Sequence, residues 1–228
     1  MKALLSRLRA VRSRSAARRV APCVALVLGL FLLTPSPAAP PIVGDVQQVE
    51  EDWRIQIANP SPDSDSPQFT IVFGPADPAT GTHAVFEVNH STQPDFVEGG
   101  MQLQCWWGEE LVGYKNQHHP AELHVSNETI TFTTVTRVQG AKITMEVLNG
   151  NSQSFGEFGG ESYLRLAVTT QQANLNGFDA DYSVNHSRCG WGANRVPKFS
   201  RTAIRYLDGD GQVLAEDATE RVIHQLAQ

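Results

Sequence analysis

The chain has 228 residues, and its 24 acidic and 18 basic side chains are unevenly distributed along it. Seven of the basic residues and none of the acidic ones lie in residues 1–19, so residues 39–228 carry 24 acidic against 11 basic side chains, a net charge of −13. Nucleic acid and anionic membrane surfaces both require clustered cations, so we expect neither as a partner of this part.

Residues 1–38 are predicted to be a secretory signal peptide. A cationic start is followed by an apolar run from Val20 to Leu33 and then by small residues and prolines, which is the order found in such leaders. Ser36 and Ala38 are the small residues that signal peptidase requires, so we place the cleavage after Ala38. The apolar run of 14 residues is shorter than the about 20 that span a bilayer, and an uncleaved anchor is the alternative. We therefore expect a protein that is secreted, periplasmic or on the cell surface.

The rest of the chain is predicted to be one structural unit built from short strands. Residues 39–68 are expected to hold an N-terminal strand and a polar loop rich in Pro, Ser and Asp, and residues 69–228 the main domain. Alternating runs rich in Val, Ile, Thr and Phe are separated by clusters of Gly, Pro, Asn and Asp, at 69–73, 83–89, 101–106, 130–133, 143–147, 163–169 and 202–207. This pattern favours an all-β fold, an antiparallel β-sandwich or jelly roll, with a barrel as the alternative.

Two segments could suggest metal binding. Asp208-Gly209-Asp210-Gly211 begins like a calcium loop, but Gln212 and Val213 follow where further oxygen ligands are required. Two Asp-Gly pairs between apolar runs are instead typical of a hairpin turn. The histidines of residues 118–124 are interrupted by a proline that prevents a helix from aligning them. We expect neither a metal site nor a cofactor.

Three tryptophans are the candidate ligand-binding residues: Trp106, Trp107 and Trp191. Only one of two neighbouring tryptophans can point inward on a regular strand, so one of Trp106 and Trp107 should lie on a surface. Cys105 and Cys189 lie beside them and are the two cysteines that remain after cleavage. In an exported chain they form a disulfide or stay as two buried thiols, and the sequence leaves both outcomes open.

No sequence motif points to catalysis. Glycosidases need two carboxylates placed across the scissile bond, and the pairs Glu109–Glu110 and Glu157–Glu161 are ordinary surface residues in loops. Nucleophile elbows, zinc-protease motifs and phosphate-binding loops are missing from the sequence. We therefore expect a protein that is not an enzyme and has no catalytic residues.

Four short segments carry a resemblance: VEEDW at 49–53, VFEVNH at 85–90, GGMQLQ at 99–104 and NRV at 194–196. They resemble a family of exported β-rich proteins of planctomycete-type bacteria that has no assigned activity. The resemblance implies export, a bacterial source and one β domain, and its members are often encoded near pilus-assembly components. It also weighs against the disulfide, because relatives carry an apolar residue at the position of Cys105.

Taken together, these features predict an exported, non-enzymatic β-sandwich of the cell envelope or extracellular space. Its expected role is structural or adhesive, in association with a pilus-like assembly. The first alternative is a carbohydrate-binding module that uses an exposed tryptophan. The second is a jelly-roll enzyme that acts on polysaccharides.

Overall fold

The computed structural model describes residues 42–61, 66–89, 100–117, 123–160 and 162–227. They belong to one compact unit, which spans Ala38–Gln228. The predicted signal peptide, its cleavage point and the alternative of an anchor lie outside the described residues. Within the described part of the chain, no helix is long and apolar enough to cross a membrane.

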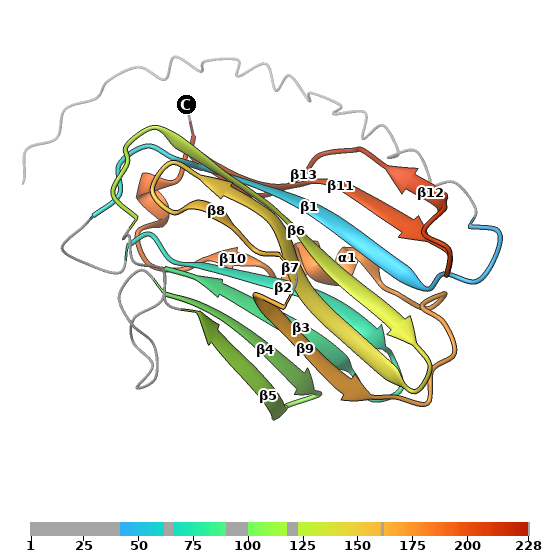
Figure 1. The fold of residues 1–228 in the computed structure, drawn as a ribbon. Coiled ribbons are helices and arrows are strands. Elements are labelled where there is room, and N and C mark those ends of the chain that lie inside the picture. Colours follow the sequence, from blue (N-terminus) through green and yellow to red (C-terminus); the bar gives the residue numbers. More distant parts are fainter. Residues whose placement is uncertain (1–41, 62–65, 90–99, 118–122, 161, 228) are drawn as a thin grey trace, which may run out of the picture. The chain divides into compact units, whose positions relative to one another are not determined.

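The predicted all-β fold is confirmed, because two antiparallel sheets pack against each other as a sandwich (Figure 1). The larger sheet has the order β12-β11-β1-β6-β7-β8, with β13 also paired to β11 and β9 also paired to β7. Its strands are β1 (Gln48–Ile57), β6 (Glu128–Gln139), β7 (Lys142–Ser152), β8 (Gly156–Phe158), β9 (Leu164–Thr169), β11 (Lys198–Leu207), β12 (Val213–Asp217) and β13 (Arg221–Gln225).

The smaller sheet has the order β10-β2-β3-β4-β5. Two short helices lie between β9 and β11 in the chain. The strands and helices are β2 (Phe69–Asp77), β3 (Thr82–Val88), β4 (Met101–Trp107), β5 (Glu110–Gln117), β10 (Arg188–Cys189), α1 (Ala180–His186) and the 3₁₀ helix η1 (Ala193–Arg195).

The strands bury one face each, as their alternating sequences predict. Along β3 every second residue, from Thr82 to Val88, is buried, and the residues between them are half-buried. Met101, Leu103 and Cys105 of β4 are fully buried, so they share the inner face. Because the side chains of a strand alternate between its two faces, Trp106 then lies on the outer face of the smaller sheet.

An aromatic cluster joins the two sheets in the core. Trp53 of β1 stacks on Phe132 of β6, with ring centroids 6.5 Å apart. Phe86 of the smaller sheet meets Phe132 edge-on at 5.2 Å, and Phe69 meets Phe199 edge-on at 5.9 Å. Aromatic pairs of this kind contribute about 0.5–1.5 kcal/mol each beyond the area that they bury.

Helix α1 connects the two sheets through buried polar contacts. The carboxylate of Asp179 caps its first turn by accepting from two backbone N–H groups. On one side, Ser183 Oγ donates to the carboxylate of Glu51 in β1 at 2.9 Å, and Arg201 of β11 pairs with the same carboxylate at 2.8 Å. On the other side, Ser187 Oγ accepts from the backbone N–H of Val72 in β2 at 2.9 Å. The helix therefore holds the central strands of the larger sheet to β2 of the smaller one.

Of the two outcomes that the sequence leaves open, the structure has the two free thiols, with no disulfide between Cys105 and Cys189. Cys105 lies on β4 and Cys189 on β10, with β2 and β3 between these strands. Three strand spacings separate them by about 14 Å, whereas bridged Cα atoms lie within ~7 Å of each other. Burial raises the pKa of Cys105 to about 11 and the pKa of Cys189 to about 12, so both thiols are protonated at neutral pH.

Candidate ligand-binding site

A hollow of about 380 Å³ opens at one end of the sandwich, between the two sheets. Small-molecule sites typically have volumes of about 300–1,000 Å³. The smaller sheet contributes the last residue of β4 and the β2–β3 turn, and the larger sheet contributes the end of β9. Its surface is mainly apolar, and its lining residues are Asp77, Ala79, Thr80, Trp107, Thr169, Thr170 and Gln171.

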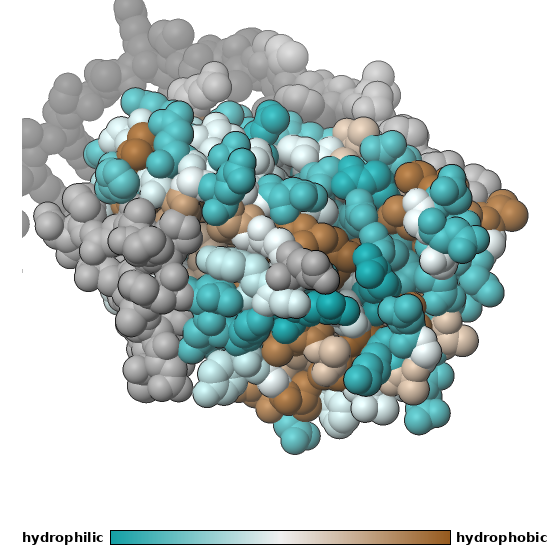
Figure 2. All heavy atoms as spheres, viewed as in Figure 1, coloured by the Kyte–Doolittle hydropathy of each residue, from teal (hydrophilic) through white to brown (hydrophobic). Residues whose placement is uncertain are grey.

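Trp107 forms one wall of the hollow. It follows Cys105 in the alternation of β4 and therefore lies on the inward-facing side, opposite Thr82 of β3. The core ends before this position, so the indole is 42% exposed instead of buried. Figure 2 shows apolar residues gathered over β9 and the adjoining ends of β4 and β5, on an otherwise mostly hydrophilic surface. The hollow thus presents a large apolar ring face to solvent.

The carboxylate of Asp77 fixes the other walls of the hollow. It is buried and accepts from the backbone N–H of Ala79 at 2.9 Å, within the β2–β3 turn. It also accepts from the side-chain amide of Gln172 at 2.8 Å, which follows β9. One side chain therefore joins the two segments that face Trp107 and fixes their positions.

Polar groups surround this apolar surface. Thr80, Thr169 and Gln171 are exposed, and their hydroxyl and amide groups can donate and accept hydrogen bonds. The hydroxyl groups of Thr80 and Thr82 lie 2.5 Å apart, which orients the Thr80 side chain at the rim. The hollow combines an aromatic wall with several uncharged hydrogen-bonding groups.

The structure does not bring the three predicted tryptophans together. Trp106 is half-buried on the outer face of the smaller sheet, where its Nε1 donates to the side chain of Gln104 at 2.9 Å. Trp191 is 69% exposed, in the loop after β10. That loop is bound to Gln68, at the start of β2, whereas Trp107 lies beside Asp77, at the end of β2. Trp191 is therefore at the opposite end of the smaller sheet.

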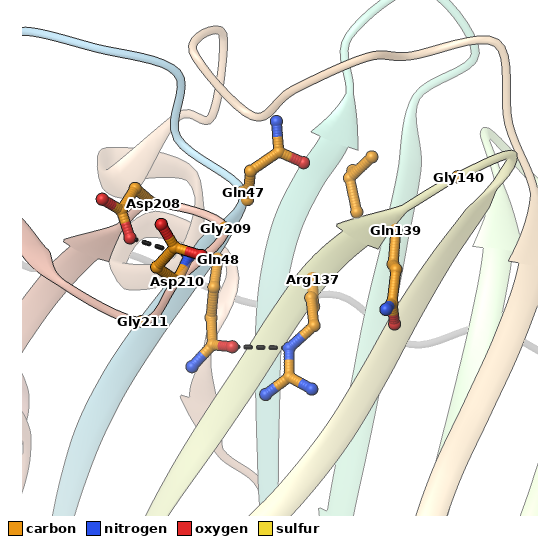
Figure 3. A pocket seen from close by; sticks show the side chains of 10 residues that line it. Gln47, Gln48, Arg137, Gln139, Gly140, Asp208, Gly209, Asp210 and Gly211 are labelled. Carbon is orange, nitrogen blue, oxygen red and sulfur yellow. Dashed lines mark hydrogen bonds between the residues drawn. The ribbon is translucent and has the colours of Figure 1, made fainter.

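A second, polar hollow of about 430 Å³ lies beside the β11–β12 hairpin (Figure 3). Asp208 Oδ1 accepts from the backbone N–H groups of Asp210 at 2.9 Å and Gln212 at 2.8 Å, which confirms the hairpin turn in place of a calcium loop. Arg137 Nε donates to Gln48 Oε1 at 2.5 Å (Figure 3). These polar groups bind one another instead of converging on a shared point.

The remaining residues singled out in the sequence are dispersed. Glu109 is exposed in the β4–β5 turn, Glu110 is exposed at the start of β5, and Glu157 is exposed in β8. Glu161 and most of the histidine-rich segment, residues 118–122, lie outside the described residues. Among the residues that are described, no group of three or more His, Cys, Asp or Glu side chains is placed to hold a metal ion.

Sequence reasoning identified Trp107 but missed the rest of the hollow. Asp77-Pro78-Ala79-Thr80-Gly81 has the composition of a turn, and this signal could have placed it at a strand end. No signal relates it to residues 169–171, because the contact between Asp77 and Gln172 joins positions 95 residues apart.

The fold and the hollow define an all-β sandwich with a preformed ligand-sized site at one end. No protein-family model matches the sequence, and a search of curated proteins finds no match. The resemblance to exported proteins of planctomycete-type bacteria therefore stays a prediction from the four sequence segments that carry it.

Proposed function

We propose that the protein is an exported, non-enzymatic β-sandwich with an adhesive role, and that it binds a glycan in the hollow at Trp107. The observation that carries this proposal is the half-exposed indole, which faces a preformed hollow with hydroxyl and amide groups at its rim. The leader supports export. The proposal unites the adhesive role expected from the sequence with its first alternative, a carbohydrate-binding module.

A sugar ring has the surface that such a hollow complements. Its C–H groups form an apolar face that can lie on an aromatic ring, and its hydroxyl groups extend from the edge as donors and acceptors. Trp107 supplies the flat apolar surface, while Thr80 and Thr169 supply hydroxyl groups at the rim. Uncharged polar groups around an apolar wall fix the orientation of a ligand as well as its identity.

The net charge of residues 39–228 restricts the class of glycan. The value of −13 disfavours uronic-acid-rich or sulfated chains, because like charges repel across an interface. A neutral glycan avoids this repulsion. The ligand that we propose is therefore a neutral sugar.

The test is binding of the purified protein to an array of neutral polysaccharides, with Trp107→Ala as the variant. An aromatic contact is worth about 0.5–1.5 kcal/mol, so the variant should bind up to about tenfold more weakly. Trp191→Ala is the matched control, because it removes an exposed tryptophan at the opposite end of the same sheet. Equal binding by wild type and Trp107→Ala would contradict the proposal.

The other expectations from the sequence are outcomes of the same experiment. If no glycan binds, the account reduces to a purely structural envelope protein, and association with a pilus-like assembly becomes the next test. If bound polysaccharide is shortened, with new reducing ends, the protein is an enzyme and the non-enzymatic proposal fails.

A further inference from the structure

Two glycines separate the hollow from the outer face of the smaller sheet. Gly81 follows Thr80 in the β2–β3 turn, and Gly108 follows Trp107 in the β4–β5 turn. Gly108 N–H donates to Gly81 O at 3.4 Å, so the two turns lie side by side. A Cβ added to Gly108 would meet no atom within 4 Å. The rim is therefore open at this point, with no side chain from either glycine.

Aromatic and apolar side chains continue on the outer face immediately beyond this rim. Trp106 lies opposite Leu111 of β5, and Gln104 lies opposite Tyr114 of β5. Leu111 is 44% exposed and Tyr114 is 52% exposed. A register shift in β5 separates these two pairs, and Trp106 and Tyr114 provide two successive ring surfaces on one face.

Amide side chains lie between these rings and bind one another in a fixed arrangement. Gln104 accepts from Trp106 Nε1 at 2.9 Å and donates to Glu87 at 3.2 Å. Gln102 donates to Asn116 at 2.7 Å. Gln104 also donates to Gln102, so both of its amide N–H groups are used, and its oxygen keeps a second lone pair that can accept from a hydroxyl group. The outer face thus places ring surfaces beside amide groups, with the carboxylate of Glu87 on the same face.

We infer that the hollow, the glycine rim and the outer face form one continuous track, which binds a neutral oligosaccharide chain with one end in the hollow. Trp107 holds the terminal sugar, the chain passes over Gly81 and Gly108, and Trp106 and Tyr114 hold the following sugars. This inference rests on the proposed function and deepens it, since it specifies a chain and a direction in place of a single sugar.

The charges beside the rim support a neutral chain. Glu109 and Glu110 follow Gly108 directly, and both are exposed. A carboxylate or sulfate on the chain would meet these two charges where it crosses the rim. Uncharged hydroxyl groups can accept hydrogen bonds there or donate them to the carboxylates.

The test uses soluble oligomers of glucose, galactose, mannose and N-acetylglucosamine, from monomer to hexamer, with affinity measured by calorimetry. For the sugar that binds, affinity should rise at least about tenfold from monomer to hexamer, because Trp106 and Tyr114 add two aromatic contacts of about 0.5–1.5 kcal/mol each. Trp106→Ala should remove most of this rise and leave the monomer's affinity unchanged. Trp107→Ala should weaken the monomer and the hexamer alike.

Gly108→Asn tests the crossing point directly, because it places a side chain on the open rim. Asn tolerates the left-handed backbone that Gly108 adopts, with φ +55°. Gly140→Asn is the matched control: Gly140 has φ +59° and equally open space, in the β6–β7 turn. The two variants should have equal melting temperatures, and only Gly108→Asn should reduce hexamer binding to the monomer's level.

The outcomes separate this inference from the proposal beneath it. If affinity is independent of chain length, or if Gly108→Asn binds the hexamer as Gly140→Asn does, the track is refuted, while the single-sugar site at Trp107 stands. If Trp107→Ala binds every oligomer as wild type does, or if no oligomer binds at all, both the track and the proposed function fail.

Discussion

Replacing Arg201 by methionine should destabilise the protein through one buried charge. Arg201 and Glu51 form an ion pair at 2.8 Å, and each side chain is only 2% exposed. Arg201 Nη1 also donates to the carbonyl of Ala180, at the start of α1, at 2.6 Å. The substitution therefore leaves a carboxyl group in the core without its cation and removes a contact that holds α1 to the larger sheet.

The magnitude follows from the burial of both groups. Removing one partner of a buried ion pair costs about 3–5 kcal/mol. We expect a loss near 3 kcal/mol, the lower end of that range, for two reasons. Ser183 still donates to the carboxylate of Glu51, and Arg201 Nε has no hydrogen-bond partner among the described residues. The Arg201→Met variant thus loses a cation whose Nε makes no hydrogen bond, so the loss of stability is smaller than for a fully hydrogen-bonded arginine.

The double variant with Glu51→Leu and Arg201→Met is the informative comparison. Replacing a whole buried ion pair by apolar residues is often neutral or stabilising. In the double variant Ser183 Oγ and the Ala180 carbonyl lose their partners, and each lost hydrogen bond lowers the free energy of unfolding by about 1 kcal/mol. The double variant should therefore be more stable than Arg201→Met alone. Urea unfolding, followed by tryptophan fluorescence, measures four proteins: wild type, Glu51→Leu, Arg201→Met and the double variant. A double variant that loses the sum of the two single effects would refute this reasoning.

Three further predictions concern pH, thiol reactivity and packing. Burial raises the pKa of Glu51 from 4.5 to about 7, so the contribution of Glu51 to stability is full below pH 4.5 and is lost as the pH rises through 7. The unfolding free energy of Glu51→Gln should not decline over this pH range. The same decline in Glu51→Gln as in wild type would contradict this prediction. Cys105 and Cys189 are free, so they should react slowly with a thiol reagent in the folded protein and quickly after unfolding in urea. If the unfolded chain has no reactive thiols, the two cysteines form a bridge and this prediction is wrong. Gly150→Ala would place a Cβ 2.3 Å from the ring of Phe158 in β8 and should lower the free energy of unfolding by about 1–3 kcal/mol. Gly113→Ala is the comparison, because the nearest atom to its Cβ would lie at 4.0 Å, and it should lower the free energy of unfolding by less.

The strands of the core could be predicted from the sequence because their burial alternates residue by residue. Met101, Leu103 and Cys105 share a face on that basis alone, and the same rule separates Trp106 from Trp107. Helix α1 could not be predicted, because seven residues are too short to show a helical period. The capping residue Asp179 was its one local signal, since Asp is a preferred N-cap.

The features that the sequence left open or missed depend on the order of strands in the sheet. Cys105 and Cys189 invite a bridge in the sequence, but β2 and β3 stand between them. The hollow likewise joins a turn near residue 78 to the end of β9, through the contact between Asp77 and Gln172. Alternation along one strand carries no information about such long-range neighbours.

The most direct test of the central claim follows the side-chain N–H signals of the four tryptophans by NMR while the neutral oligosaccharide is added. Trp107 lines the proposed site, Trp53 is buried in the core, and Trp191 lies exposed at the opposite end of the smaller sheet. The account predicts a saturable shift of the Trp107 signal, with those of Trp53 and Trp191 unmoved. A shift of Trp191 while Trp107 stays in place would contradict it.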